Sequence, residues 1–477
     1  MRVAVIGQGS IGRRHAAILL ELGHEVAVYD PSPAVQSPPG VLVTATAREC
    51  LQGADAAVVA SPSNEHPADA RAAIELGVPV LVEKPLALDS AHATELDCLA
   101  REREVMLSVA MNLREHPGVR ALAALLAEGA VGRILRASAW CGSWLPGWRA
   151  DSDYRHSYSA RAALGGGVLL DVAIHELDYL LWLTGPVRSV SAVARHVSDL
   201  ETDVEDVALI AMELASGGLA EIVVDYFDRS YTRGCRIVGS DATLHWSWEQ
   251  ERLTRDGGAG GCQEQRIASD ISPTYVRELE RFLAAIAQGA DAPVPAADAR
   301  QVLAVLDAAR TSAREERTVR LAPTPALRAA TVADEERLLA WRNDPETRRW
   351  SRQQEEVTAD DHRHWLQRTL GDPSTSLMIA ELDGVPVGQV RVSQDTPMCA
   401  ELHITVAPEA RGRGLASTML IEAAARALAE PKTERLIAYV KPDNNPSLRA
   451  FEHAGLDVCG ADSEGLLCLE RCVAARG

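Results

Sequence analysis

The chain has 477 residues, of which 47% are hydrophobic and 24% charged, and its formal net charge at pH 7 is −19. This composition is typical of a globular protein of about three domains, and it excludes a disordered chain, a collagen-like repeat and a small disulfide-stabilised protein. The excess of acidic residues argues against non-specific binding to nucleic acid or to an anionic membrane surface.

The nine cysteines are scattered without a CxxC pair, so the sequence predicts neither a zinc site nor a thioredoxin-like motif, and we expect no bound metal. An odd cysteine count is typical of a reducing compartment, and Met1–Gly7 reads as a strand rather than as a signal peptide. We therefore expect a cytoplasmic protein. The apolar stretch Val168–Leu183 is interrupted by Asp171, His175 and two further acidic residues, so no transmembrane helix is expected.

Strands and helices alternate over residues 1–120. Strands separated by helices of roughly ten residues or more indicate βαβ units, and therefore a parallel sheet. The expected helices are Ile11–Leu22 and a segment around Pro67–Leu76, and the expected strands are Arg2–Ile6, Glu25–Tyr29, Asp55–Ala60 and Pro79–Val82.

The pattern changes in the middle of the chain, at residues 121–320. Longer strands with alternating apolar and polar residues predict an antiparallel sheet with one open face. These strands are Arg133–Trp140, Val187–His196, Asp206–Leu214, Leu219–Asp225 and Gly234–Gly239. A glycine-rich surface loop is expected at Asp256–Cys262, and helices are expected near Pro273–Ala287 and Ala296–Glu315.

A third pattern, residues 327–477, begins after a proline-containing linker at Arg317–Ala326. Met378–Leu382 and Val387–Val392 flank Asp383-Gly384, which is a strong hairpin signal. The other expected elements are helices at Ala333–Trp341, Leu415–Leu428 and Pro446–Ala454, and strands at Leu402–Ala407 and Leu436–Val440.

Gly7, Gly9 and Gly12 form a GxGxxG motif between the first strand and the first helix. The first glycine allows a tight turn, the second lets the backbone approach a pyrophosphate, and the third permits close helix packing. Asp30 ends the next strand, where a carboxylate binds a ribose 2′-hydroxyl and repels a 2′-phosphate. The motif predicts a dinucleotide site that prefers NAD(H) to NADP; the alternative is that the glycines serve an ordinary turn.

Two further segments carry residues suited to acid–base chemistry. Lys84 follows a predicted strand, at the sheet edge where α/β folds bind ligands. Asp171 and His175 follow a run of three glycines and lie four residues apart, on one face of a helix. An imidazole suits proton transfer during alcohol oxidation or ketone reduction, and a carboxylate can hold its tautomer. Each residue taken alone has a simpler interpretation: Lys84 as a solvated surface charge, and His175 as a histidine of the core.

Together these segments resemble the Gfo/Idh/MocA family of NAD(P)-dependent sugar oxidoreductases over residues 1–320. The resemblance rests on GQGSIGRRHA (7–16), SPSNEHP (61–67), VEKPLA (82–87), MNLREHP (111–117) and LGGGVLLDVAIHELDYL (164–180). It implies an N-terminal Rossmann domain (1–120) and an α+β domain with an open-faced antiparallel sheet (121–320), whose last helices pack back on the Rossmann domain. It also implies a homo-oligomer formed through the open sheet.

The resemblance further assigns roles to individual residues. It implies that Lys84, Asp171 and His175 are catalytic, with His175 as the acid–base group at the oxygen of the reacting carbon. The residues expected to bind the cofactor, beyond the three glycines and Asp30, are Ser10, Ile11, Ser61, Asn64, His66, Glu83 and Asn112.

A loop between Trp144 and Arg161 concentrates arginines and aromatic residues. Arginines can bind phosphate or carboxylate, and aromatic rings can stack on a sugar or base. In an acidic protein this loop predicts contact with an anionic substrate through Arg149, Tyr154, Arg155 and Arg161. Two alternatives stay open: the arginines pair with Asp151 and Asp153, or the loop packs a subunit interface.

The third domain carries a second glycine-rich loop before a long helix. Its residues Arg411, Gly412, Arg413, Gly414 and Ala416 can present backbone N–H groups to a pyrophosphate. With Asn444, Ser447, Phe451 and Gly455, this loop resembles the GNAT N-acetyltransferase family, which implies an α/β fold and acetyl-CoA as co-substrate. Phe451 departs from the usual tyrosine, so the general acid expected at that position is missing.

A base must still remove a proton from the acceptor ammonium. Glu401 and His403 share one face of a predicted strand, and Glu401 is our preferred base; the alternative is cross-strand polar pairing. The segment 339–349 resembles acetyltransferases of pseudaminic-acid biosynthesis, which implies that Trp341, Arg342 and Asn343 contribute to acceptor recognition. Acetyltransferases of ribosomal-protein N-termini share a similar opening.

The sequence therefore predicts a bifunctional enzyme of amino-sugar biosynthesis. One half would oxidise or reduce a sugar hydroxyl or ketone with NAD(H), and the other would acetylate an amino group on a nucleotide-linked sugar. Two alternatives are an oxidoreductase with a non-catalytic CoA-binding module and a protein N-acetyltransferase with an NAD-sensing domain.

Overall fold

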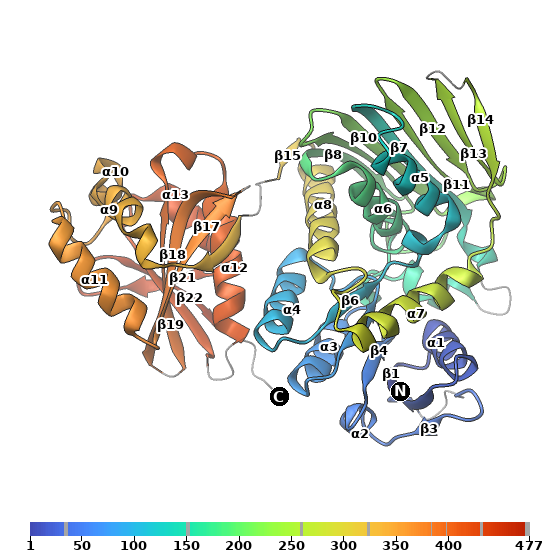
Figure 1. Cartoon of the computed structure of the whole chain (residues 1–477), viewed down its shortest axis with the longest axis horizontal. Coiled ribbons are helices and arrows are strands. Elements are labelled where there is room, and N and C mark those ends of the chain that lie inside the picture. Colours follow the sequence, from blue (N-terminus) through green and yellow to red (C-terminus); the bar gives the residue numbers. More distant parts are fainter. Residues whose placement is uncertain are drawn as a thin grey trace. The chain divides into compact units, whose positions relative to one another are not determined.

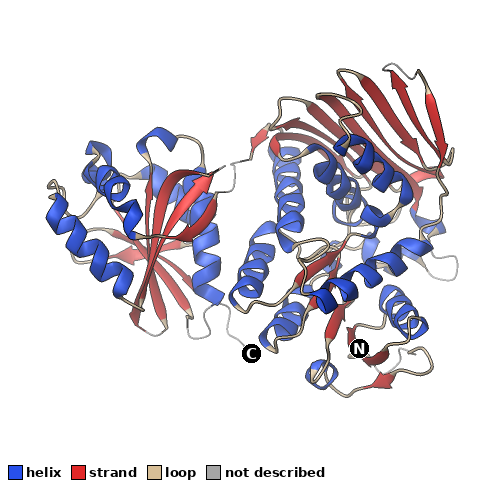
Figure 2. Cartoon of the chain, in the orientation of Figure 1, coloured by secondary structure: helices blue, strands red, loops and turns tan. Residues whose placement is uncertain are grey.

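The computed structural model describes residues 1–32, 37–148, 153–257, 261–321, 325–382, 384–396, 398–429 and 433–472. The chain divides into two compact units, Met1–Leu321 (unit 1) and Ala322–Gly477 (unit 2). Figure 1 draws them in the colours of the sequence and Figure 2 by secondary structure. The first two predicted domains lie within unit 1, and the third lies in unit 2.

The N-terminal part of unit 1 is a six-stranded parallel sheet in the order β3-β2-β1-β4-β5-β6. The strands β4, β5 and β6 are buried at every position, as in parallel sheets covered on both faces. The elements are β1 (Arg2–Ile6), α1 (Ser10–Glu21), β2 (Glu25–Tyr29), β3 (Leu42–Val43), α2 (Ala47–Leu51), β4 (Ala56–Val59), α3 (His66–Glu75), β5 (Val80–Glu83), α4 (Ser90–Glu102) and β6 (Leu107–Ala110). The strand order reverses between β1 and β4, which is where such sheets bind ligands.

The rest of unit 1 is built on a nine-stranded sheet in the order β14-β13-β12-β11-β7-β10-β9-β8-β15. Only β7 and β10 pair in parallel among the described strands; the other neighbours are antiparallel. The strands are β7 (Ile134–Trp144), β8 (Val187–Arg195), β9 (Val207–Leu214), β10 (Leu219–Asp225), β11 (Phe227–Gly239), β12 (Ala242–Ser247), β13 (Arg252–Gly257), β14 (Gln263–Arg266) and β15 (Val319–Arg320). The predicted glycine-rich loop joins β13 to β14, and residues 258–260 of it lie outside the described part of the chain.

One face of this sheet is open, as predicted (Figure 2). Burial alternates along β10, and the outward positions include the apolar Leu219 and Val223 as well as the acidic Glu221. Val193, Leu209 and Val223 stand directly opposite one another on β8, β9 and β10, and are 52%, 48% and 41% exposed. The other face contacts α5 (Pro117–Ala127), α6 (Ile174–Thr184) and α8 (Ala296–Glu315).

The last helices of unit 1 pack against the parallel-sheet part of the same unit. Helix α7 (Ser272–Gln288) contacts α1, and α8 contacts α4 and β6. Leu279, Phe282 and Leu283 of α7 join the buried cluster formed by β1, β2 and α1. Both parts of unit 1 are thus tied together by packing as well as by the chain. No helix in the described ranges is both long and apolar enough to cross a bilayer.

Unit 2 has a seven-stranded sheet in the order β16-β17-β18-β19-β20-β22-β21, in which β19 and β20 pair in parallel. Its strands are β16 (Ala326–Ala329), β17 (Thr375–Leu382), β18 (Val385–Thr396), β19 (Cys399–Val406), β20 (Arg435–Val440), β21 (Asp457–Ala461) and β22 (Leu467–Cys472). Its helices are α9 (Glu335–Asn343), α10 (Pro345–Trp350), α11 (Ala359–Gly371), α12 (Leu415–Ala429) and α13 (Asn445–His453). Helix α12 contacts β16, β18, β19 and β20, whereas α11 packs on β17 and α9.

The predicted elements of unit 2 are present, but the sequence reading omitted α10, α11 and the strands β16, β21 and β22. At the predicted linker, β15 pairs with β8 of unit 1 and β16 pairs with β17 of unit 2. Pro323 of the linker and Asp383 of the predicted hairpin turn lie outside the described residues.

Candidate active sites

The glycine-rich loop between β1 and α1 is built to receive a dinucleotide. Gly7 has a φ of +89°, which favours glycine, and a Cβ at Gly12 would lie 2.0 Å from the Gly7 carbonyl oxygen. A Cβ at Gly9 would meet nothing within 4 Å, so Gly9 faces open space at the N-terminus of α1. The first and third glycines are therefore required by the fold, and the space beside the second fits a pyrophosphate. Ser10 and Ile11 form the first turn of this helix.

Asp30 closes this loop from the end of β2. Its carboxylate accepts hydrogen bonds from the backbone N–H groups of Gln8, at 2.7 Å, and Ser32, at 2.8 Å. A carboxylate oxygen that accepts one hydrogen bond still has a lone pair for another donor. Asp30 holds the loop and keeps acceptor capacity for a further donor, and its contact with a ribose hydroxyl stays a prediction.

A hydrogen-bonded ion pair joins Lys84 to Asp171 within unit 1. The Nζ atom of Lys84, one residue after β5, donates to the Asp171 carboxylate at 2.8 Å and to the Asp171 carbonyl at 2.9 Å. Burial alone would lower the pKa of Lys84, but the negative charge of Asp171 outweighs it and raises that pKa. Likewise, burial would raise the pKa of Asp171, but Lys84 holds it below its ordinary value. The pair is therefore ionised.

Two tyrosines complete the hydrogen bonding of Asp171. The hydroxyl of Tyr158 donates to the same carboxylate oxygen as Lys84, and Tyr226 lies 3.4 Å from the other oxygen. Tyr158 belongs to the arginine- and aromatic-rich loop between Trp144 and Arg161, but no contact with Asp171 was predicted for it or for Tyr226. The two tyrosines come next to Asp171 only in the folded chain, so no spacing in the sequence indicated this contact.

His175 follows Asp171 by one turn. Asp171 lies in the π-helical segment Leu169–Ala173, and His175 lies in the first turn of α6. The residue as a whole is half-buried, and its Nδ1 is buried without a hydrogen-bond partner among the described residues. Burial, together with the positive charges of Lys84 and Arg233, lowers the pKa of His175 well below 6.5. His175 is therefore a neutral imidazole at pH 7 and can accept a proton.

A second buried ion pair lies beside His175. Arg233, on β11, has its Nε 2.9 Å from the carboxylate of Glu176, and both side chains are nearly inaccessible. Arg233 places a positive charge near the His175 imidazole, and Glu176 balances that charge within the pair. Neither residue was predicted, because the distance from β11 to α6 depends on packing rather than on spacing along the chain.

The other residues predicted to bind the cofactor mostly contact protein atoms. Both ring nitrogens of His66 face carbonyl oxygens, of Pro85 at 2.7 Å and of Ser61 at 2.8 Å. Glu83 accepts a 2.7 Å hydrogen bond from His15 on α1. Three further pairs complete this set: Ser61 with Asp69, Asn64 with Glu65, and Asn112 with Thr274. Of this set, His66 and Glu83 hold the turn that carries Lys84, through the Pro85 carbonyl and the Lys84 backbone N–H.

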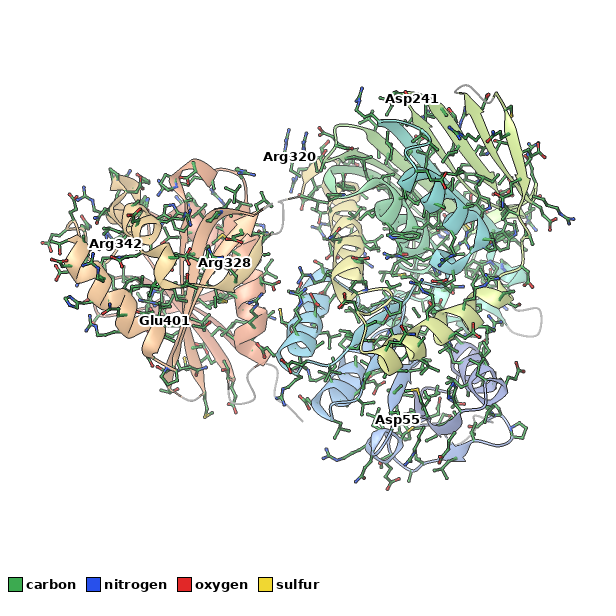
Figure 3. The ribbon with its side chains drawn as sticks, viewed as in Figure 1. Asp55, Asp241, Arg320, Arg328, Arg342 and Glu401 are labelled. Carbon is green, nitrogen blue, oxygen red and sulfur yellow. The ribbon has the colours of Figure 1, made fainter. Side chains whose placement is uncertain are left out.

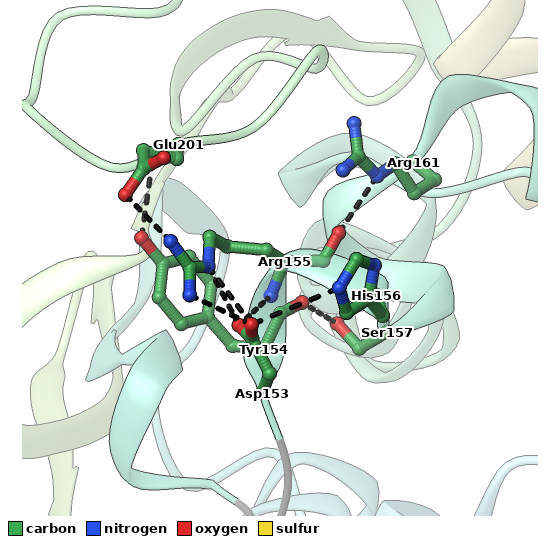
Figure 4. Close-up of polar contacts among 7 residues, drawn as sticks. All are labelled: Asp153, Tyr154, Arg155, His156, Ser157, Arg161 and Glu201. Atoms are coloured by element: carbon green, nitrogen blue, oxygen red, sulfur yellow. Dashed lines mark hydrogen bonds and ion pairs between the residues drawn. The ribbon is translucent and has the colours of Figure 1, made fainter.

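The arginine-rich loop is paired internally where it is described (Figure 4). Arg155 forms an ion pair with Asp153 at 2.8 Å and reaches Glu201 at 3.2 Å. Arg161 donates to the carbonyl of Arg155 and lies 3.6 Å from Asp203, and the hydroxyl of Tyr154 accepts from the Glu201 backbone. Of the two alternatives for this loop, the pairing of an arginine with Asp153 is therefore observed, at Arg155. Arg149 and Asp151 lie outside the described residues.

In unit 2 the glycine-rich loop precedes α12. Gly412 and Gly414 have φ values of +74° and +75°, and a Cβ at Gly412 would meet nothing within 4 Å. Arg411 donates to Asp344 at 2.5 Å and to the Thr347 hydroxyl at 2.8 Å, which ties the loop to α10. The open space at the loop fits the pyrophosphate of CoA. Arg413 and Ala416 flank the second of these glycines.

The second GNAT-like segment forms the start of α13. Asn444 caps this helix by accepting from the backbone N–H of Ser447 at 3.3 Å. Phe451 is 3% exposed and belongs to the hydrophobic core of unit 2. The position that would hold an acid is therefore an apolar core residue.

Glu401 and His403 lie side by side on β19. Their side chains are 3.4 Å apart, and Glu401 is shown in Figure 3. The hydrogen bond from His403, and the charges of Arg352 and Arg391, lower the pKa of Glu401 despite its partial burial. Glu401 is therefore a carboxylate at pH 7, as a base requires.

The three residues predicted to contact the acceptor, Trp341, Arg342 and Asn343, lie in different environments. Trp341 is 4% exposed within the core of unit 2, and Asn343 bonds through its side chain to both backbone groups of Val357. Arg342 is partly exposed and donates to the carbonyl of Gln353 at 2.8 Å. Of the three, Trp341 is therefore a core residue, and a contact of Arg342 or Asn343 with the acceptor stays a prediction.

Three known families match consecutive parts of the chain. Residues 1–111 match the oxidoreductase family with an NAD-binding Rossmann fold, residues 119–245 match the GFO/IDH/MocA C-terminal domain, and residues 326–457 match the acetyltransferase (GNAT) domain. The predicted families and fold class are thereby confirmed. NAD(H) is the cofactor of the first unit, and acetyl-CoA is the co-substrate implied for the second.

Individual proteins are similar to this chain over different lengths. An uncharacterized oxidoreductase of Synechocystis sp. is 35% identical over 172 residues, which are 34% of this chain and 46%, about half, of that protein. A UDP-N-acetylglucosamine 3-dehydrogenase of Acidithiobacillus ferrooxidans is 28% identical over 304 residues, 60% of this chain and 89% of that protein. The crystal structure of GenD2 from gentamicin A biosynthesis, in complex with NAD, has a TM-score of 0.58 and 25% identity, and covers 67% of this chain and 96% of that one.

Titration of the histidines should show His175 losing its proton below pH 6.5, because burial and two neighbouring cations disfavour the imidazolium. NMR of histidine-labelled protein measures the midpoint, and His175→Gln assigns the signal. A midpoint at or above 6.5 in the folded protein would contradict this electrostatic description of the site.

Changing Asp30 to Ser or Asn should weaken NADH binding roughly tenfold or more, because hydrogen bonds to a charged group contribute about 1.5–3 kcal/mol. The same variants should narrow the difference between NADH and NADPH, since the carboxylate no longer repels a 2′-phosphate. Fluorescence titration measures both affinities. The assignment of Asp30 fails if the unmodified protein binds NADPH as tightly as NADH.

Proposed function

The chain joins the two domains of a Gfo/Idh/MocA oxidoreductase to a GNAT acetyltransferase domain, and on this premise we propose that it is a bifunctional enzyme of amino-sugar biosynthesis. Unit 1 would oxidise a sugar hydroxyl, or reduce the ketone, and unit 2 would acetylate an amino group. The observation that carries the first half is the convergence of Lys84, Asp171 and His175. The second half rests on the GNAT glycine loop and the Glu401–His403 pair.

In unit 1, Lys84 and His175 divide the work at the substrate oxygen. NAD, when bound, supplies or accepts the hydride. Lys84 is held cationic by Asp171 and stabilises negative charge on that oxygen. His175 is neutral and takes the hydroxyl proton during oxidation, and returns it during ketone reduction. Tyr158 keeps the Asp171 carboxylate in place, so it acts as a positioning residue.

In unit 2, Glu401 would remove a proton from the acceptor ammonium, directly or through water. The amine nitrogen then attacks the acetyl carbonyl carbon, the carbon–sulfur bond breaks, and the second N–H proton passes to the departing thiolate, directly or through water. A thiolate leaves without an acid because thiol pKa values are near 8.5. The core position of Phe451 is therefore compatible with catalysis.

Two relatives and the combination of an oxidoreductase with an acetyltransferase domain support one class of substrate. One relative is named as a UDP-N-acetylglucosamine 3-dehydrogenase and another as a reductase of a dTDP-linked deoxy sugar. An oxidised sugar and an acetylated amine belong to one sequence of reactions when a transaminase converts the ketone to the amine between them. The proposed substrate is therefore a nucleotide-linked amino sugar.

Lys84→Met and His175→Gln should each lower sugar oxidoreduction at least about a hundredfold, the range for loss of a general acid–base group. Both should leave acetyl transfer unchanged, and Glu401→Gln should give the reverse pattern. Steady-state assays of NADH and free thiol measure the two activities on each purified variant. Joint loss of both activities in a variant that remains folded would refute two separate sites.

We also propose that the open face of the nine-stranded sheet mediates a homo-oligomer, since Val193, Leu209 and Val223 form an exposed apolar strip there. Leu209→Glu should reduce the mass measured by light scattering to that of a smaller assembly. Leu76→Glu, at an exposed apolar residue just after α3, is the matched control. An unchanged mass for Leu209→Glu would place the interface elsewhere.

A further inference from the structure

Two of the described cysteines of unit 2 face each other on neighbouring strands. Cys459 lies on β21 and Cys468 on β22, and these strands form an antiparallel hairpin at the end of the sheet. Val458 pairs with Leu469, and Gly460 pairs with Cys468, so Cys459 is the extra residue of a β-bulge. In a bulge, two residues of one strand oppose a single residue of its partner. Cys459 and Gly460 therefore both oppose Cys468.

The two cysteines are in contact. The Sγ atom of Cys459 donates a hydrogen bond to the carbonyl oxygen of Cys468 at 3.3 Å. Burial, followed by a hydrogen bond with the Cys459 side chain, raises the pKa of Cys468 to about 11. A Cβ at Gly460 would meet nothing within 4 Å, so this residue leaves room beside the thiols. Opposed residues of antiparallel strands have Cα atoms roughly 4.5–5.5 Å apart, a span that a disulfide bridges.

Cys459 is open to solvent, and Cys468 lies behind it. Cys459 is exposed, whereas Cys468 is half-buried. Cys262 of unit 1 is also exposed, and the other cysteines whose side chains the structure describes are buried, namely Cys50, Cys98, Cys141, Cys235 and Cys399. A thiol reacts with a small molecule in solution only where that molecule can reach it. Cys459 is therefore the thiol of the pair that is reached first.

The pair shares a face of the sheet with the proposed base. Glu401 of β19 pairs with Ile437 of β20, and Tyr439, two residues further along β20, pairs with Cys468. Paired residues, and residues two apart on one strand, lie on the same face of a sheet. The core of unit 2 holds the alternate residues instead, namely Leu436, Ala438 and Leu469. Cys468 is therefore on the face that carries Glu401.

Two contacts connect the hairpin to Arg352, whose charge acts on Glu401. The guanidinium carbon of Arg352 lies 4.9 Å from the centroid of the Tyr439 ring. The same guanidinium lies 3.5 Å from the carboxylate of Asp462, in the turn between β21 and β22. Tyr439 also forms a hydrogen bond with the Cys468 side chain, which opposes the rise in the pKa of that thiol. Side-chain contacts thus run from the thiol pair toward the proposed base.

We propose that Cys459 and Cys468 are a reversible thiol–disulfide pair, whose oxidation closes the hairpin covalently on the face of the sheet that carries Glu401. The oxidant is a small disulfide, such as oxidised glutathione. Cys459, as the thiolate, attacks one of its sulfurs, so a mixed disulfide forms and one glutathione leaves and takes up a proton. Cys468 then loses its proton and attacks the Cys459 sulfur, and the second glutathione leaves. The protein gives up two electrons and two protons, which the small disulfide gains.

The exposure of the pair favours a disulfide that opens again. Exposed disulfides are reduced more readily than buried structural ones. In a reducing compartment such disulfides are transient and serve catalysis or redox sensing. Since β21 is the terminal strand of its sheet, the bond would tie that strand to β22 in the oxidised protein. The site goes beyond the proposed function and does not rest on it, because the bulge and the thiol contacts carry it.

The test is disulfide mapping of the full chain after equilibration with oxidised or reduced glutathione. Free thiols are blocked with iodoacetamide, and trypsin then cleaves after Arg449 and Arg471, so both cysteines lie in the peptide 450–471 and Cys472 lies in the next. After oxidation this peptide should lose two hydrogen atoms and carry no blocking group, and reduced glutathione should reverse the change. A second cleavage after Glu464 should leave two fragments that separate only on reduction.

Serine variants assign the two steps. Cys468→Ser should keep a stable glutathione on Cys459, because the thiol that displaces it is missing. Cys459→Ser should leave Cys468 largely unmodified, since Cys468 is half-buried. Cys262→Ser removes an exposed cysteine of unit 1 and is the matched control, in which the peptide 450–471 should be oxidised as in the unmodified protein. Binding of acetyl-CoA and NADH confirms that each variant is folded.

Three results would overturn the proposal. These are two thiols that stay free in oxidised glutathione, a mixed disulfide that persists on Cys459 while Cys468 is present, and a disulfide that links either cysteine to Cys472. The mapping requires no turnover, so it is decided separately from the proposed acetyl transfer.

Discussion

The ion pair between Lys84 and Asp171 is the contact on which the oxidoreductase site depends. It joins the end of β5, in the parallel sheet, to the π-helical segment that leads into α6 beneath the nine-stranded sheet. The side chains are 14% and 3% exposed, so removing one partner would leave a buried charge at a cost of about 3–5 kcal/mol. The same contact thus links the two parts of unit 1, in addition to the packing of α7 and α8, and fixes the position of Lys84.

The protonation state of His175 depends on burial and on the charges around it. His175 lies one turn beyond Asp171, and burial, together with the positive charges of Lys84 and Arg233, lowers the pKa of its imidazole well below 6.5. Tyr158 and Glu176 complete the arrangement by holding the carboxylate of Asp171 and by pairing with Arg233. Charges are balanced within each pair, and the histidine is the group left to exchange a proton.

The sequence predicted the local parts of this site and missed those that depend on packing. Gly7, Gly12 and Asp30 belong to one βαβ unit, so their spacing along the chain already reflects their geometry. Asp171 and His175 are one helical turn apart for the same reason. Tyr226 lies between β10 and β11 and Arg233 lies on β11, and their distance from α6 is fixed only by sheet register and helix packing.

In unit 2, the sequence predicted the elements with a clear apolar pattern and missed the others. Strands β17 to β20 and helix α12 carry clear apolar periodicity and were predicted. Helix α10 has six residues, and α11 is rich in charged and polar residues, so neither gives a strong pattern. Trp341 could be recognised as apolar, but only the fold shows it within the core while its neighbour Arg342 stays accessible.

The two units place their buried charges differently. In unit 1, Lys84 and Arg233 each face a carboxylate near His175, and we propose that selectivity for the cofactor rests on Asp30. In unit 2, the hydrogen bond from His403 lowers the pKa of Glu401, the proposed base. The account therefore gives each half its own chemistry, on one chain.

The central claim is that one chain acts on an amino sugar with two chemistries, and the most direct measurement is acetylation of a panel of nucleotide-linked amino sugars by the pure protein. Free thiol release and the mass of the product report the reaction. The account predicts an N-acetylated product from one member of the panel, which would also name the sugar to be tried with NAD(H). Binding of acetyl-CoA without acetylation of any sugar would contradict it.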